Sequence, residues 1–412
     1  MSRHESTPGD HARRETPSLM PVAAVSWETQ TWSPTGGISG LTRLERKAQF
    51  GSTYASAIPA RIADLDLTVP AELSAAMDEA TSGLARFDGA ARFRSGAFLA
   101  VMLRSESASS SQIERITASA RSVAEAEITG TGSGNAAIVA ANVHAMTQAL
   151  SFMGPLTAGR IEAIQKTLMA HDESLVGWRT EQVWIGGLGS TPVGADFVPP
   201  HQDRVPECMD DLITFIGRDD IPPLLQAAIA HAQFETIHPF ADGNGRAGRA
   251  LIHAVLKEKE LMTGTIAPIS AGLLVDRETY FAALDSFRRG DAAPIVSAFV
   301  RAALHATHHG AVLGDRIDAI CDSWRARIVA RSDSAVWRVL DAFAGHPVAD
   351  ARTVAAAVGV APTNVARHLR KLADAGFLVG TQHHRSHRFL YRAPEILAAL
   401  DEYAAGLGRR AR

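Results

Sequence analysis

Two helical patterns meet at His238-Pro239-Phe240-Ala241-Asp242-Gly243-Asn244-Gly245-Arg246-Ala247-Gly248-Arg249, near the middle of this 412-residue chain. The glycines at 243 and 245 allow a tight turn that brings backbone N–H groups close to a ligand. N–H groups at the start of a helix form an anion site, because unpaired donors and the helix dipole both favour negative charge. The pattern therefore predicts a phosphate-binding turn between two helices.

The polar side chains of the same stretch suit chemistry on a magnesium-bound polyphosphate. Arg246 and Arg249 are three residues apart, so they occupy neighbouring positions on the emerging helix, and the arginine fork donates two hydrogen bonds to one phosphate. Asp242 supplies the hard oxygen that magnesium prefers beside a phosphate. His238 can act as a base near neutral pH. An ordinary glycine-rich turn with solvated arginines would leave this combination unexplained.

The stretch resembles the signature of the Fic/Doc family, His-x-Phe-x-Asp/Glu-Gly-Asn-Gly-Arg-x-x-Arg, and every specified position is filled. The resemblance implies a mainly α-helical, Fic-type core with a β-hairpin flap. It also implies transfer of AMP from ATP to a Ser, Thr or Tyr hydroxyl of a target protein, with Mg²⁺ as the cofactor. The roles that it implies are His238 as general base, Asp242 as magnesium ligand, and Gly243, Asn244, Gly245, Arg246 and Arg249 as ATP-binding residues. A tyrosine-rich helix walls the adenine in relatives, which adds Tyr280 to the ATP-binding set.

A second motif lies upstream, where a serine cluster precedes an apolar position in Ser107-Ala108-Ser109-Ser110-Ser111-Gln112-Ile113-Glu114-Arg115. By itself this pattern predicts a helix start or a polar loop. Beside the signature, Ser110-x-x-x-Glu114 resembles the family's inhibitory motif, Ser/Thr-x-x-x-Glu-Gly/Asn. The resemblance implies that Glu114 pairs with Arg249 and obstructs the γ-phosphate. Arg115 stands where Gly or Asn is expected, which predicts a different helix end or a competing pair with Glu114.

Two extended segments lie between these motifs, at 178–187 and 195–198, where Trp, Val, Ile and Phe favour strands. They resemble the family's flap, which implies that a target protein docks there by strand-to-strand hydrogen bonds. An ordinary surface hairpin would explain the same residues without the signature.

The C-terminal part differs in charge and pattern. From Arg331 onward the chain holds 12 Lys and Arg against 7 Asp and Glu, whereas the part before it holds 29 against 37. Three helices and a hairpin of two strands follow in an order that resembles a winged helix-turn-helix domain, in which the second helix of the helix-turn-helix pair enters the major groove. The DNA-facing positions would be Asn364, Arg367, His368 and Arg370, with Arg385 and Arg388 in the wing. Docking of a protein is an equal alternative.

The composition is typical of a soluble globular protein, with 46% hydrophobic and 21% charged residues. No apolar run reaches the roughly 20 residues of a membrane helix, and the N-terminus has no signal-peptide core. Cys208 and Cys321 are too few for a disulfide framework, so we expect a cytoplasmic protein with no membrane partner. The predicted divisions are a disordered tail at 1–35, a helical region with the inhibitory segment at 36–130, the Fic core at 131–310, a linker helix and winged-helix domain at 311–395, and a C-terminal tail at 396–412.

Three functions stay open at this point. The first is an adenylyltransferase that Glu114 inhibits. The second is a DNA-binding regulator, and the third is an enzyme that removes AMP from modified proteins, in which Glu114 positions a water. Relatives of this class often dimerise, so a homodimer is also expected. The spacing of His231, Glu235 and His238 invites a zinc site, but it lacks the adjacent His-Glu pair of metalloproteases, and Glu235 is better explained as an orienting partner.

Overall fold

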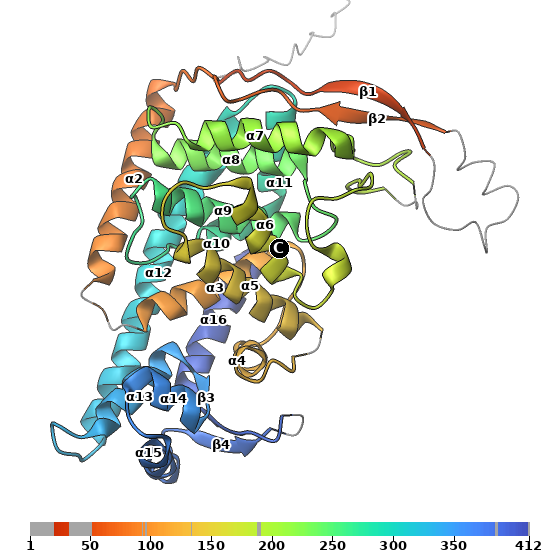
Figure 1. Cartoon of the computed structure of the whole chain (residues 1–412). Coiled ribbons are helices and arrows are strands. Elements are labelled where there is room, and N and C mark those ends of the chain that lie inside the picture. Colours follow the sequence, from red (N-terminus) through yellow and green to blue (C-terminus); the bar gives the residue numbers. More distant parts are fainter. Residues whose placement is uncertain are drawn as a thin grey trace, which may run out of the picture.

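The computed structural model describes residues 20–32, 52–92, 94, 97–132, 134–187, 191–383 and 386–410. This part of the chain is mainly α-helical, as predicted, with two small antiparallel sheets (Figure 1). In chain order the elements are β1 (Ser26–Thr31), β2 (Thr53–Ile58), α2 (Ala71–Ala91), α3 (Phe98–Ile113), α4 (Ala120–Thr129), α5 (Asn135–Ser151), α6 (Ala158–Leu168), η1 (Glu173–Leu175), η2 (Gln202–Arg204), α7 (Val205–Ile216), α8 (Pro223–Ile237), α9 (Asn244–Glu258), α10 (Ile269–Val275), α11 (Arg277–Arg288), α12 (Ala293–Arg327), α13 (Ala335–Gly345), β3 (Val348–Ala349), α14 (Ala351–Val358), α15 (Pro362–Asp374), β4 (Val379–Gln382), β5 (Phe389–Arg392) and α16 (Pro394–Arg410).

Helix α8 lies at the centre of the helical core. Every residue from Leu224 to Ile237 is buried, as expected for a helix that has no distinct polar face. Helices α7, α9, α11 and α12 pack around it. The turn between α8 and α9, which carries the signature, therefore begins and ends on helices that the core holds in place.

The longest helix, α12, connects this core to the C-terminal part of the chain (Figure 1). It packs against α2, α8 and α10 of the core and also against α13 and α16. The predicted boundary between residues 310 and 311 falls inside this helix, next to the buried Gly310 and Leu313. No loop separates core and linker at that point, because one continuous helix belongs to both.

The prediction of a disordered tail at 1–35 is wrong for residues 20–32. Strand β1 pairs antiparallel with β2, with Ser26 opposite Ile58, and we call these two strands the arm (Figure 1). Met20 is buried, and its carbonyl accepts a hydrogen bond from Ala292 N at 3.0 Å. The segment lacks the alternation of apolar and polar residues that predicts a strand. Its ordered structure is therefore evident only from its pairing with β2 and its contact with the start of α12.

The serine cluster does not start a helix, so that prediction is wrong. Ser107 to Ser111 lie inside α3, in its last turns, and four of these five residues are buried. Helix α3 packs there against α5 and α9. Small buried side chains between helices produce the same sequence pattern as a helix cap, and only the packing distinguishes the two.

Between α3 and α6 the chain forms two helices, α4 and α5, which are separated at Gly130. Gly130 ends α4 with φ 65°, in the left-handed region that favours glycine at a helix end.

The C-terminal module consists of α13 to α15 and a three-stranded antiparallel sheet of order β3-β5-β4. The predicted helices and strands are present, whereas β3 was not predicted because it has only two residues. The winged helix-turn-helix assignment stays a prediction. The C-terminal tail predicted at 396–412 is wrong over 396–410, because α16 buries Ile396, Leu400 and Leu407 in contact with α3, α10 and α12.

Among the described residues, no helix is both long and apolar enough to cross a membrane. Cys208 and Cys321 are free thiols.

Candidate active site

The side chains of the signature turn hold the turn itself together. Helix α8 ends at His238, whose φ is 50° and whose N–H donates to Phe234 O at 2.8 Å. Asn244 Oδ1 accepts from Phe240 N at 2.9 Å, and Asn244 Nδ2 donates to Phe240 O at 2.8 Å. Phe240 is fully buried and stacks on Trp178 with ring centroids 4.8 Å apart. Asn244, predicted to bind ATP, therefore uses its side chain to clamp the loop.

Two glycines of the turn are required by its shape. Gly243 has φ 82° directly before α9, in the left-handed region that favours glycine. A Cβ at Gly245 would lie 2.4 Å from Glu114 Oε1 and 2.9 Å from Arg249 Nη1. Gly245 therefore keeps the start of α9 open to the carboxylate of Glu114, which arrives from a distant part of the chain.

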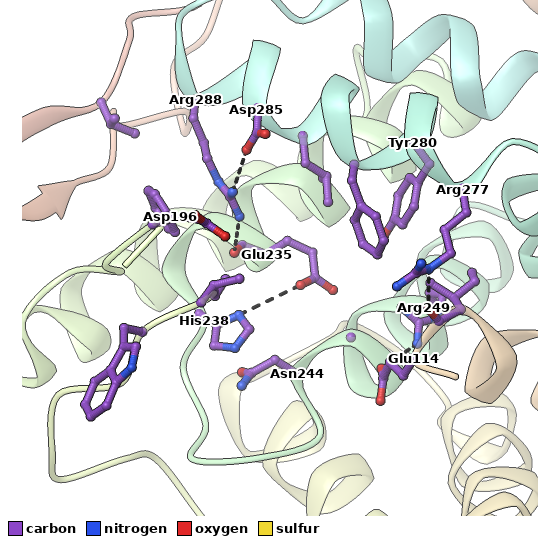
Figure 2. A pocket seen from close by; sticks show the side chains of 18 of the residues that line it. Glu114, Asp196, Glu235, His238, Asn244, Arg249, Arg277, Tyr280, Asp285 and Arg288 are labelled. Carbon is purple, nitrogen blue, oxygen red and sulfur yellow. Dashed lines mark hydrogen bonds and ion pairs between the residues drawn. The ribbon is translucent and has the colours of Figure 1, made fainter. Parts of the chain in front are cut away.

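Glu114, which directly follows α3, binds both arginines of the signature. Its Oε1 lies 2.6 Å from Arg249 Nη2 (Figure 2). Its Oε2 lies 3.1 Å from Arg246 Nε. Arg249 Nε also donates to Ser110 Oγ, and Arg249 Nη2 to Ser110 O, each at 2.8 Å. Burial alone would lower the pKa of Arg249, but the neighbouring Glu114 holds that pKa above its ordinary value. The ion pair of Glu114 with Arg249 was expected from the resemblance, whereas the second ion pair of Glu114, with Arg246, was not.

Arg115 adopts the left-handed helix end in spite of its side chain, with φ 62°. Ile116 N donates to Ser111 O at 3.0 Å, and Arg115 N donates to Gln112 O at 2.9 Å. These two bonds form the helix end that usually has Gly or Asn at this position. The predicted different ending is therefore wrong, and no Arg115–Glu114 ion pair occurs within the described part of the chain.

His238 lies at the wall of a cavity with 20% of its side chain exposed. Burial, together with the guanidinium groups of Arg288 and Arg179, lowers the pKa of His238 to about 3. The imidazole is therefore neutral near pH 7 and can accept a proton. Glu235 faces it from one turn earlier on α8, with 3.9 Å between Glu235 Oε2 and His238 Nδ1 (Figure 2). Burial raises the pKa of this Glu235 carboxyl to about 7.

The cavity has a volume of about 1110 Å³, enough for a nucleoside triphosphate with room beside it. Among the predicted site residues, those at its wall are Glu114, His238, Asp242, Gly243, Asn244, Gly245, Arg249 and Tyr280. Ser110 and Arg246 lie behind this wall, in contact with Arg249 and Glu114. The structure thus brings all the predicted site residues together around one cavity.

Helix α11 forms another side of the cavity. Tyr280 is buried, and its hydroxyl lies 2.7 Å from His231 Nε2. The guanidinium of Arg277 lies 4.8 Å from the centre of the Phe281 ring, and Arg277 Nε donates to Ile113 O at 2.6 Å. Aromatic and guanidinium surfaces of this kind stack on bases. Tyr280 therefore lines the cavity beside Arg277 and Phe281, two residues that the sequence did not identify, and its contact with adenine stays a prediction.

Asp242 is the acid that was predicted to hold magnesium. Its side chain is 54% exposed at the cavity wall, and its Oδ1 accepts from Gly243 N at 2.6 Å. No cluster of three His, Cys, Asp or Glu side chains suited to a metal occurs among the described residues. Mg²⁺ usually takes one or two carboxylates, substrate phosphates and waters. The site therefore fits magnesium that arrives with a nucleotide, and it does not form an all-protein metal cage.

The flap segments and the arm form the remaining walls. The predicted strands at 178–187 and 195–198 do not form regular strands in their described residues. Ile185 and Phe197 meet in a single antiparallel bridge, and Gly186 turns the chain there with φ 70°. Glycine is required at this position because a Cβ would clash with the side chain of Asp196. Trp27 of the arm contacts Phe197 edge-on, with ring centroids 6.0 Å apart.

Several wall residues were not predicted, among them Trp27, Arg277 and Arg288. Arg288 lies 3.9 Å from the centre of the Phe197 ring and donates to Glu235 O at 3.2 Å (Figure 2). Their sequence neighbourhoods carry no motif. They reach the cavity because α11 and the arm fold back onto α8, which no local pattern reveals.

Comparison with known proteins identifies the central region. Residues 155–256 match the Fic/DOC family, which confirms the prediction made from the signature. A probable protein adenylyltransferase of Aquifex aeolicus is 32% identical over 127 residues, which cover 29% of this chain and 37% of the relative. A protein adenylyltransferase of Caenorhabditis elegans is 32% identical over 118 residues, covering 29% of this chain and 21% of the relative. The chain thus spans well under half the length of these relatives.

Among solved structures, a Fic family protein from Desulfovibrio desulfuricans is 23% identical, with a TM-score of 0.49 over 79% of this chain and 97% of that one.

Proposed function

We propose that this chain, which carries a Fic/DOC family domain at residues 155–256, transfers AMP from ATP to a hydroxyl of a target protein. The observation that carries the proposal is the assembly of His238, Asp242 and Arg249 around one cavity on the two sides of the turn. The names of the relatives, which are protein adenylyltransferases, support it. So does the size of the cavity, which accommodates a nucleotide and the end of a target segment.

The proposed reaction begins with a proton transfer to His238. As the target hydroxyl loses its proton to the neutral imidazole, its oxygen attacks the α-phosphorus of ATP. The bond from the α-phosphorus to the bridging oxygen breaks, and pyrophosphate leaves. The N–H groups near Gly243 and Gly245 and the arginine side chains would stabilise the charge that develops on the phosphates. Magnesium, held by Asp242 and the phosphates, would neutralise part of that charge.

The contacts of Glu114 support an inhibited resting state. Nε and Nη2 of Arg249 are engaged by Ser110 and Glu114, and Arg246 also binds Glu114. A γ-phosphate would have to compete with a carboxylate at 2.6 Å for the same guanidinium. We therefore propose that displacement or removal of Glu114 activates the enzyme. In the resting enzyme, ATP would bind without its α-phosphorus in line with the attacking hydroxyl.

The flap supports a mode of target binding. Trp184, Ile185, Asp196 and Phe197 border the same cavity as His238. An extended target segment that pairs with this backbone would present its hydroxyl beside the imidazole with little demand on its sequence.

The test is self-modification with ATP labelled at the α-phosphate. Glu114→Gly is expected to raise incorporation at least tenfold over the parent, because it frees both arginines. His238→Ala in the same background is expected to abolish it, since a positioned base contributes about 10²–10⁴-fold. Glu207→Gly, at an exposed glutamate of α7, serves as the matched control and should leave incorporation at the parent level. An unchanged rate in Glu114→Gly would reject the inhibitory role, and full activity without His238 would reject its role as the base.

A further inference from the structure

We propose that the C-terminal module binds duplex DNA through the outward face of α15. This activity is separate from the nucleotide transfer, because α15 lies at the far end of the molecule from the arm and from α7 and α8 (Figure 1).

The inference starts from the geometry of α14 and α15. The two helices pack together and are joined by residues 359–361, where Gly359 turns the chain with φ 66°. Short turns with glycine connect the helices of helix-turn-helix motifs. Helix α15 has 13 residues, about 20 Å of helix, and a B-DNA major groove about 12 Å wide admits a helix.

The two faces of α15 differ sharply in chemistry. Val365, Leu369 and Leu372 are buried in the module, at the spacing of one helix face. The opposite face exposes polar and charged side chains, three cations against one carboxylate, namely Thr363, Asn364, Arg367, Arg370, Lys371 and Asp374. A helix held by one apolar stripe and cationic on the other side presents its charges as a rigid unit to an incoming polyanion.

The cations of this face are not neutralised by the protein. Among the described residues, no carboxylate lies within ion-pair distance of Arg367, Arg370 or Lys371, whereas Arg388 of the same module pairs with Asp350. The pKa of the neighbouring His368 is also affected by these cations. Its pKa is lowered first by burial and then by the positive charges of Arg367 and Lys371. The chain as a whole carries a formal charge of -3, so this cationic face is opposite in sign to the net charge of the molecule.

Charge complementarity favours DNA over a protein partner. Protein interfaces concentrate apolar and aromatic side chains at their centre, and the exposed face of α15 has none. The exposed apolar residues of the module are Val379 and Phe389, on the β4–β5 hairpin. A protein partner would be expected on those residues, which provides a variant that distinguishes the two cases.

The structure also corrects the predicted wing contact of Arg388. Its guanidinium is held by Asp350 and by Ile128 O of α4, so it is not available to a phosphate. The other predicted wing residue, Arg385, lies outside the described residues.

The experiment measures fluorescence anisotropy of the full chain with a labelled random-sequence duplex of about 20 base pairs, two helical turns. We expect binding at low salt that weakens with a log–log slope of about −3, close to −0.9 for each of three neutralised phosphates. The double variant Arg367→Glu/Arg370→Glu is expected to abolish the binding. Arg86→Glu/Lys166→Glu, two exposed sites in the catalytic half with the same change of charge, should leave it within twofold.

Three outcomes would overturn the proposal. They are no binding of the parent at low salt, equal losses in both double variants, and a loss in Phe389→Ser but not in Arg367→Glu/Arg370→Glu. The last of these would identify an apolar protein contact instead. Far-ultraviolet circular dichroism of each variant shows that the chain is folded, and this control depends neither on the DNA result nor on nucleotide transfer. Failure of the transfer proposal would therefore not affect this one.

Discussion

At the level of single residues, Arg115 occupies a backbone conformation that suits it poorly. Its φ of 62° lies where a side chain costs about 1–2 kcal/mol relative to the right-handed region. The two helix-end hydrogen bonds of α3 and the neighbouring ion pair of Glu114 hold it there. The strain therefore lies directly beside the carboxylate that occupies the two arginines.

Arg115→Gly is expected to stabilise the protein by about 1 kcal/mol, because glycine adopts this conformation without strain. The measurement is the midpoint of chemical unfolding, together with basal self-modification, which should fall or stay unchanged as the helix end tightens. Arg115→Ala is the control, since it removes the guanidinium and keeps the strained Cβ. Equal stabilisation by both variants would show that the side chain, and not the backbone, is the source.

The acid range of the reaction should depend on Glu235. Above its pKa the carboxylate lies 3.9 Å from His238 Nδ1 and favours the imidazolium that forms as the proton is taken. Below about pH 7 the carboxyl becomes protonated, because burial raises its pKa to about 7, and this help is lost. We expect transfer by Glu114→Gly to fall as pH drops through a midpoint below 7, since the charge of Glu114 also contributes to the raised pKa.

Glu235→Gln in that background is expected to lower transfer about tenfold at pH 8, since a nearby charge moves a pKa by about one unit or more, and to remove the acid limb. Asp285→Asn is the matched control, because Asp285 also lines the cavity and contacts Arg288. An acid limb that persists unchanged in Glu235→Gln would refute this role.

At the level of elements, α3 determines where Glu114 stands. A buried carboxylate in the middle of the helix fastens it to the core: Glu106 accepts from His253 Nε2 of α9 at 2.8 Å and from Ser270 N of α10 at 2.9 Å. Arg104 of the same helix pairs with Glu127 of α4 at 2.9 Å. A helix fixed at these points cannot easily swing away, so release of Glu114 is more easily achieved by the turn that follows it.

Glu106→Ala is expected to lower the free energy of unfolding by about 3–5 kcal/mol, because it leaves His253 and Ser270 buried without their acceptor. It should also raise self-modification, by less than Glu114→Gly does, since α3 loses an anchor but keeps its carboxylate. Urea unfolding and label incorporation measure the two effects. The control Glu207→Ala, at an exposed ion pair, should change stability by less than about 1 kcal/mol. A stable Glu106→Ala protein would show that the anchor is unimportant.

At the scale of the whole molecule, the C-terminal module and the end of α3 that carries Glu114 share neighbours. Arg104 of α3 also donates to Gly345 O at the end of α13, and Arg388 of the module donates to Ile128 O of α4. Helix α16 returns to pack on α3 and α10. The module is therefore packed against the helices beside Glu114, even though α15 itself is free on its outer face.

Much of the catalytic half could be predicted from the sequence. The signature and its bounding helices α8 and α9 are local features, in which each residue acts on neighbours a few positions away. The same holds for the helices and hairpin of the C-terminal module. The arm, α16 and the true end of α3 could not be predicted, because their order depends on packing against distant elements.

The amino-acid sequence alone was sufficient to place a histidine, an aspartate, two glycines and two arginines on one turn. These residues lie within twelve consecutive positions, so their proximity follows from the chain itself and needs no tertiary contact. Only the folded structure showed that Glu114 holds Arg246 as well as Arg249. It alone brought Arg277, Arg288 and Trp27 to the same cavity. The hydrogen bonds of Glu114, Arg277 and Arg288 to other segments join residues from 53 to 164 positions apart, and chain segments at such separations meet only when the core around α8 has formed.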